Sequence, residues 1–88
     1  MNTSSLINIG LGNYISRGKI LAVLKPDSSP VRRLVKESRE SGKILDATQG
    51  RKTRSIIVMD NGCIVLCSLG ARSIAEKFQP KHQENDQE

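Results

Sequence analysis

The sequence predicts a small α+β domain with two helices and a mixed or antiparallel sheet that includes a β-hairpin in its C-terminal half. Three observations lead to this fold class. Short apolar runs bounded by glycine-rich turns are typical of strands. Residues 30–41 place apolar side chains at helical spacing. The length of 88 residues allows one domain with a small core.

Three strands are expected before the first helix. Residues 6–9 form an apolar run that ends in a glycine turn at 10–13, and residues 14–16 begin a second extended piece. A short basic turn interrupts this piece before the third strand, at 20–24.

A helix is predicted from residue 30 to about residue 41. Ser29 suits the N-cap, Pro30 suits the first helical position, and Gly42 is a typical residue just after a helix. One face has the i, i+3, i+4, i+7 spacing of a buried stripe. Its residues are Val31, Leu34, Val35 and Ser38.

The remaining face of this helix is charged. Arg33 and Lys36 each precede a glutamate by four residues, Glu37 and Glu40, so we expect ion pairs that neutralise much of this face. The alternative is that the face contacts a partner.

A strand at 44–48 and a β-hairpin follow in the second half of the chain. Residues 55–67 form two strands joined by Asn61-Gly62, the pair that a two-residue type I′ turn prefers. A last helix is expected from 71 to 78.

Both hairpin strands are apolar at consecutive positions, so both faces of the sheet must be covered. Two short helices offer little cover, and we therefore expect a homo-oligomer in which a second subunit covers one face. The alternative is a compact monomer with its helices on opposite faces. Cys63 and Cys67 lie too far apart along one strand to form a disulfide. We expect both to be reduced core residues of a cytoplasmic protein.

The chain is basic, with a formal net charge of +5. Residues 80–88 contain one lysine and three acidic residues, so the rest of the chain has thirteen basic and six acidic residues, a net +7. We expect residues 1–79 to form a single domain and 80–88 a disordered acidic tail. No apolar run approaches the ~20 residues of a membrane span, and no export signal is visible.

Catalytic patterns are missing from the sequence. The one histidine, His82, lies in the polar tail, and Asp46 is expected to pair with Arg54 or to accept a turn hydrogen bond. The glycine turn at 10–13 lacks the third glycine of a dinucleotide-binding motif. We therefore predict no enzyme activity, cofactor, metal or small-molecule substrate.

Two basic segments are candidates for binding phosphates. Residues 50–54 combine a glycine, three cations and a hydroxyl just before a strand, and the turn at 17–19 can lie beside them. The candidate residues are Arg51, Lys52, Lys19, Arg54 and Arg17. The alternative is a solvated polar loop.

Duplex DNA fits this composition best among polyanions. Modules that bind single strands or RNA stack bases on aromatic rings, and this chain has only Tyr14 and Phe78. A membrane surface needs bulky apolar anchors, which the basic helix lacks. Two alternatives stay open: an RNA-binding protein, and a protein-interaction or scaffold module whose charge serves solubility.

Residues 46–60, which read Asp-Ala-Thr-Gln-Gly-Arg-Lys-Thr-Arg-Ser-Ile-Ile-Val-Met-Asp, resemble the RemA family of small bacterial regulators of extracellular-matrix genes in biofilms. Residues 7–13 and 26–30 share the likeness, which spans about residues 6–78. It implies a DNA-binding transcription regulator, assembled as a homo-oligomeric ring whose repeated basic rim binds bent duplex DNA.

The resemblance also assigns roles to residues. The family's DNA-contacting arginines correspond to Lys19, Arg51 and Lys52 of this chain. Lysine at 19 and 52 retains a point charge for phosphate but removes the planar fork that makes bidentate base contacts.

Overall fold

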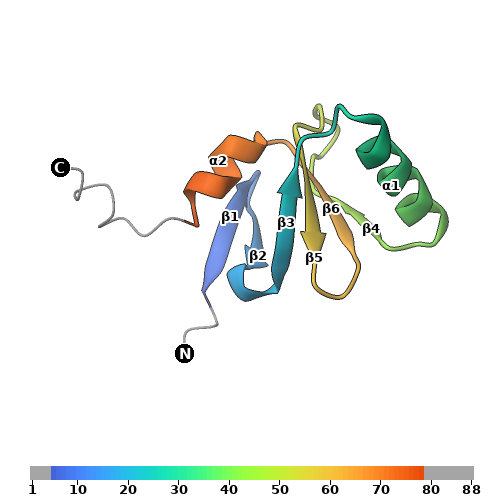
Figure 1. Ribbon diagram of the computed structural model, residues 1–88. Helices are drawn as coiled ribbons and strands as arrows, with labels where there is room; N and C mark the ends of the chain where they lie inside the picture. The colour runs from blue at the N-terminus through green and yellow to red at the C-terminus, as the bar shows by residue number, and fades with distance from the viewer. Residues whose placement is uncertain (1–4, 79–88) are drawn as a thin grey trace.

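The computed structural model describes residues 5–78, which form an α+β domain with two small sheets and two helices (Figure 1). This confirms the predicted fold class. The tail predicted at 80–88, with His82, lies outside the described residues. The elements are β1 Leu6–Gly10, β2 Asn13–Ser16, a 3-10 turn Arg17–Lys19, β3 Ile20–Leu24, α1 Ser29–Glu40, β4 Ile44–Asp46, β5 Ser55–Met59, β6 Ile64–Cys67 and α2 Ala71–Glu76.

The main sheet has four strands in the order β3-β5-β6-β4. β5 is antiparallel to both β3 and β6, whereas β4 runs parallel to β6 at the far edge. β1 and β2 form a separate antiparallel hairpin. Figure 1 shows α1 beside β4 at one end of the molecule and α2 beside β1 at the other.

The central hairpin, β5 and β6, separates two apolar cores. The first core takes Ile57, Val65 and Cys67 from the hairpin and packs them against β1 and Ile74 of α2. The second core takes the alternate residues Ile56, Ile64 and Leu66 and packs them against the predicted stripe of α1. The two-faced alternation is confirmed, but one chain covers both faces. In residues 5–78 the two helices lie against opposite faces of the sheet, and the expected homo-oligomer stays a prediction.

Helix α1 begins one residue earlier than its sequence signals indicated. Ser28, rather than Ser29, is the N-cap, and its hydroxyl accepts a hydrogen bond of 3.3 Å from the backbone N–H of Val31. The helix ends at Glu40, and Gly42 follows with a positive φ of 75°, as expected for a glycine just after a helix. Two other elements are shorter than predicted, since β4 ends at Asp46 and α2 at Glu76.

The turn of the central hairpin differs from the predicted type I′ turn. A type I′ turn needs positive φ at both central residues, and here Gly62 has a φ of 89° while Asn61 is not in the left-handed region. The Gly62 N–H donates to the carbonyl of Met59 at 3.0 Å, and the Met59 N–H donates to that of Cys63 at 2.9 Å. The connection is thus a three-residue loop that places one glycine in the left-handed region.

The two cysteines are free thiols in different environments. Cys67 is fully buried, and its thiol donates a hydrogen bond of 3.2 Å to the carbonyl of Ile9. Cys63 is only partly buried. The prediction of a core residue is confirmed for Cys67 and was too strong for Cys63.

Candidate functional site

The basic loop at 47–54 begins with a tight polar turn. The carboxylate of Asp46 accepts hydrogen bonds from the backbone N–H of Thr48 at 2.9 Å and from its hydroxyl at 2.5 Å. The hydroxyl bond above all holds the pKa of Asp46 below its usual range. The turn-acceptor alternative for Asp46 is confirmed, whereas residues 5–78 show no ion pair between Asp46 and Arg54.

The rest of the loop is held by a hydrogen bond of its own and by bonds to two neighbouring segments. Gln49 and Gly50 take successive positive φ angles of 53° and 85°, and the Arg51 N–H closes the turn on the carbonyl of Thr48 at 3.0 Å. The Gln49 side-chain amide donates to the carbonyl of Leu11 in the β1–β2 turn at 3.1 Å. The Arg54 N–H donates to the carbonyl at the end of β6 at 2.8 Å. Hydrogen bonds within the chain therefore order the backbone that carries the cations, without a partner.

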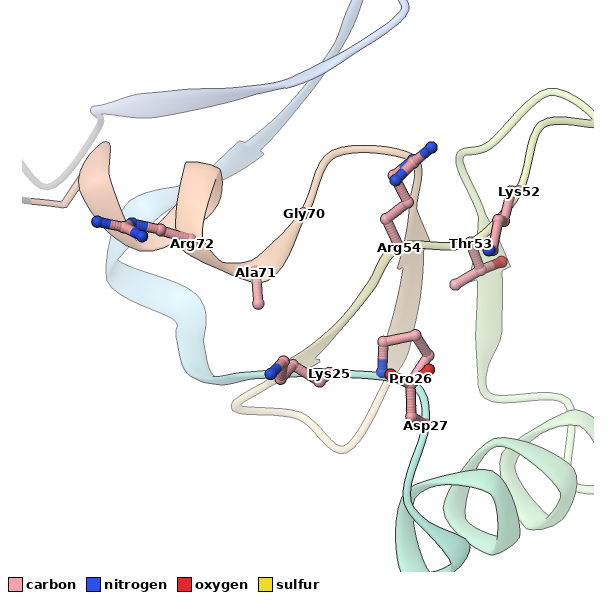
Figure 2. A pocket seen from close by; sticks show the side chains of 9 residues that line it. All are labelled: Lys25, Pro26, Asp27, Lys52, Thr53, Arg54, Gly70, Ala71 and Arg72. Carbon is pink, nitrogen blue, oxygen red and sulfur yellow. The ribbon is translucent and has the colours of Figure 1, made fainter.

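The cations of this loop are exposed and border two surface hollows. Arg51, Lys52 and Arg54 are all exposed. Within the described residues, none of the three makes a side-chain hydrogen bond or an ion pair. A hollow of about 430 Å³ is lined by Lys25, Pro26, Asp27, Lys52, Thr53, Arg54, Gly70, Ala71 and Arg72 (Figure 2). A second, of about 480 Å³, is lined by Gly10, Leu11, Arg51, Lys52, Arg54, Ser68 and Leu69.

Figure 2 shows that the cations around the first hollow come from separate segments: Lys25 after β3, Lys52 and Arg54 from the loop, and Arg72 from α2. The sequence reasoning missed Lys25 and Arg72. Neither is part of a basic run, and only the long-range pairing of strands brings them near the loop. Arg72 also makes an exposed ion pair with Glu76, with Nε 3.4 Å from Oε2.

Arg17, in the other basic turn, is bonded within the chain. Its guanidinium donates to the carbonyls of Lys77 at 2.9 Å and Phe78 at 3.3 Å, just after α2. Its central carbon also lies 5.6 Å from the centre of the Phe78 ring. Arg17 therefore holds the end of α2 against the 3-10 turn, while Lys19 is exposed to solvent. A DNA contact by Arg17 stays a prediction, and it would compete with these bonds.

The structure does not bring the two basic segments together within one chain, so their expected proximity was wrong. β3 and β5 are antiparallel, with Ile20 opposite Met59. The carbonyl of Lys19 accepts a hydrogen bond of 2.7 Å from the N–H of Asp60 at the end of β5, whereas Arg54 precedes the start of β5. The two segments thus lie at opposite ends of a five-residue strand, roughly 15 Å apart.

The charged face of α1 also differs from expectation. Within the described residues, the pairs Arg33–Glu37 and Lys36–Glu40 do not form, and the ion pair present is that of α2. The predicted neutralisation of this face was therefore wrong. A third hollow, of about 360 Å³, lies between α1 and the sheet. It is lined by Pro26, Arg32, Val35, Lys36, Arg39, Thr53, Ile56 and Leu66.

Comparison with known sequences places this arrangement in a family. The sequence model described as "RemA-like: Extracellular matrix regulatory protein A-like" matches residues 6–78. The chain belongs to the RemA-like family. The RemA-like match covers every helix and strand described above and includes both basic segments.

Two RemA-like relatives illustrate the similarity. A protein of Maridesulfovibrio salexigens named "Putative regulatory protein" is 42% identical over 86 residues, which cover 98% of this chain and all of the relative. A protein of Geobacillus sp. strain WCH70 with a name of the same kind is 44% identical over 72 residues, which cover 82% of this chain and 83% of the relative. The names of the family and of both relatives describe regulatory proteins and support a regulatory role rather than an enzymatic one.

Two further findings concern the part of the chain from 5 to 78. It contains no helix long and apolar enough to cross a membrane. It also contains no group of three His, Cys, Asp or Glu side chains placed to hold a metal ion.

Proposed function

We propose that this RemA-like chain is a transcription regulator of extracellular-matrix genes that binds duplex DNA through backbone phosphates. The observation that supports it most is the preordered loop with the exposed cations Arg51, Lys52 and Arg54. Long exposed cations suit phosphate oxygens, and a rigid loop loses little entropy on binding.

The sparse aromatic content favours duplex DNA over single-stranded nucleic acid. Tyr14 is exposed on β2, but the Phe78 ring lies beneath the guanidinium of Arg17. One exposed ring is a poor stacking platform for a run of bases. Binding through phosphates needs cations alone and depends strongly on salt.

We further propose that the protein acts as a homo-oligomer and that this oligomer is a ring. Lys19 and Arg51 lie at opposite ends of the sheet, so each copy of the chain presents exposed cations at both ends. Leu21 on β3 and Leu45 on β4 are 69% and 61% exposed, on the two opposite edges of the main sheet. A head-to-tail contact that repeats between two different surfaces closes into a ring when the rotation permits it.

The test compares the wild-type protein with Arg51→Ala in binding to a duplex of several helical turns across a salt series. We expect Arg51→Ala to weaken binding to all sequences and to lower the slope of log affinity against log salt by about 1 for each bound subunit. Light scattering with and without DNA reports the oligomer. An unchanged slope would remove Arg51 from the interface, and a monomer indifferent to DNA would favour the interaction-module alternative. A preference for RNA of equal length would favour the RNA-binding one.

A further inference from the structure

A row of cations on α1 continues the basic surface beyond the loop. Arg32, Lys36 and Arg39 are spaced i, i+4, i+7, so they share one face of the helix. All three are exposed and line the third hollow. The apolar stripe beside them packs on the sheet, which fixes the orientation of the row.

The hollow on α1 and the hollow at the loop are neighbours, because Pro26 and Thr53 line both. The row on α1 and the cations Lys52 and Arg54 therefore border one continuous surface, with Thr53 at the junction. Lys25 and Arg72 border the same surface on its other side (Figure 2).

The charges in this region are mostly uncompensated. The Arg32 guanidinium donates to the backbone carbonyl of Asp27 at 3.0 Å, which holds it in place and leaves its charge unpaired. Within the described residues, neither Lys36 nor Arg39 makes an ion pair. Three carboxylates lie nearby: Asp27 lines the loop hollow, Glu76 pairs with Arg72, and Asp46 lies within electrostatic range of Arg39. The cations outnumber them, so the surface is positive.

We infer that the row Arg32, Lys36 and Arg39 is a second phosphate-binding element, which contacts the DNA backbone next to the segment held by Lys52 and Arg54. This inference rests on the proposed DNA-binding function and extends its surface to residues outside both basic turns. Each subunit then holds the backbone from two structural elements, a loop and a helix, which fixes its orientation on the duplex as well as its affinity.

The test uses two matched neutral variants of α1. Lys36→Gln removes a cation from the row, whereas Arg33→Gln removes one from the same helix at a position that lines none of the three hollows. Both residues are exposed, and circular dichroism checks that both variants fold. Lys52→Gln serves as the reference for the loop, and Lys36→Arg as the variant that keeps the charge.

We expect Lys36→Gln to lower the salt slope of duplex binding by about 1 for each bound subunit, as Lys52→Gln does, and to weaken binding to unrelated duplexes equally. Arg33→Gln and Lys36→Arg should leave the slope near that of the wild type. Equal slopes for Lys36→Gln and Arg33→Gln, with Lys52→Gln still reduced, would overturn the helix contact and leave the loop contact intact. A wild-type protein that does not bind duplex DNA would instead overturn the proposed function together with this inference.

Discussion

The two basic segments of this chain look alike in sequence and differ in the structure. Each combines cations with a glycine beside a strand, Arg17-Gly18-Lys19 in one and Gly50-Arg51-Lys52 in the other. The cations of the second segment point into solvent, whereas Arg17 is bonded to two carbonyls about sixty residues away. A cation is free for a partner only where the fold offers it no internal acceptor, and a local pattern does not contain that information.

Among the substitutions that test this comparison, Arg17→Ala should have the largest effect, on the stability of the fold. The variant loses two charge-assisted hydrogen bonds and the contact with the Phe78 ring, so we expect the free energy of unfolding to fall by about 2 kcal/mol. Urea denaturation measures this loss. The salt slope of DNA binding then separates the two roles, because it stays unchanged if Arg17 serves the fold alone and falls if Arg17 also contacts DNA. A reduced slope with unchanged stability would mean that Arg17 contacts DNA and is not a structural residue.

Lys19→Ala tests the other cation of the first segment, whose side chain, unlike that of Arg17, is not bonded among residues 5–78. Lys19 is exposed and its side chain makes no hydrogen bond or ion pair within the described residues. Its removal should therefore change stability by less than about 0.5 kcal/mol. The salt slope of duplex binding should fall by about 1 for each subunit in contact. If Lys19→Ala and the wild type give the same slope, the DNA surface is confined to the loop and α1.

The smallest expected effect concerns Asp46, which orders the second segment. Its pKa is lowered in the folded protein, so its ionised form stabilises the fold. This contribution is present above the ordinary aspartate pKa of about 3.9 and is lost as pH falls through the lower folded value. Asp46→Asn should therefore flatten the pH dependence of stability below about pH 4, as thermal melting at several pH values would show. An identical pH profile in the variant would mean that the Thr48 hydrogen bonds contribute nothing to stability.

Local patterns predicted most of the fold. The stripe on α1 and the alternation in β5 and β6 depend on spacing within one element, and both are confirmed. The turn type was missed because Asn-Gly also suits a longer loop in which only the glycine is left-handed. The start of α1 was missed by one residue because two adjacent serines both suit an N-cap.

The parts of the site that depend on long-range strand pairing and packing could not be predicted from the sequence. The 50–54 segment was identified from its composition, but Lys25 and Arg72 approach it only through the packing of β3 and α2. The separation of Lys19 from Arg51 follows from the antiparallel pairing of β3 with β5, which the residues of neither segment encode. The sequence analysis also expected ion pairs to neutralise the charged face of α1, because its cations and glutamates lie four residues apart. This spacing does not ensure that long exposed side chains meet.

The central hairpin couples the unfolding of the two cores. β5 and β6 contribute alternate side chains to both cores, so neither core can come apart without exposing apolar surface of the same two strands. The domain should therefore unfold as one cooperative unit, although its helices lie on separate cores. Amide hydrogens of β5 and β6 should exchange with solvent most slowly, and those of the three-residue edge strand β4 much sooner.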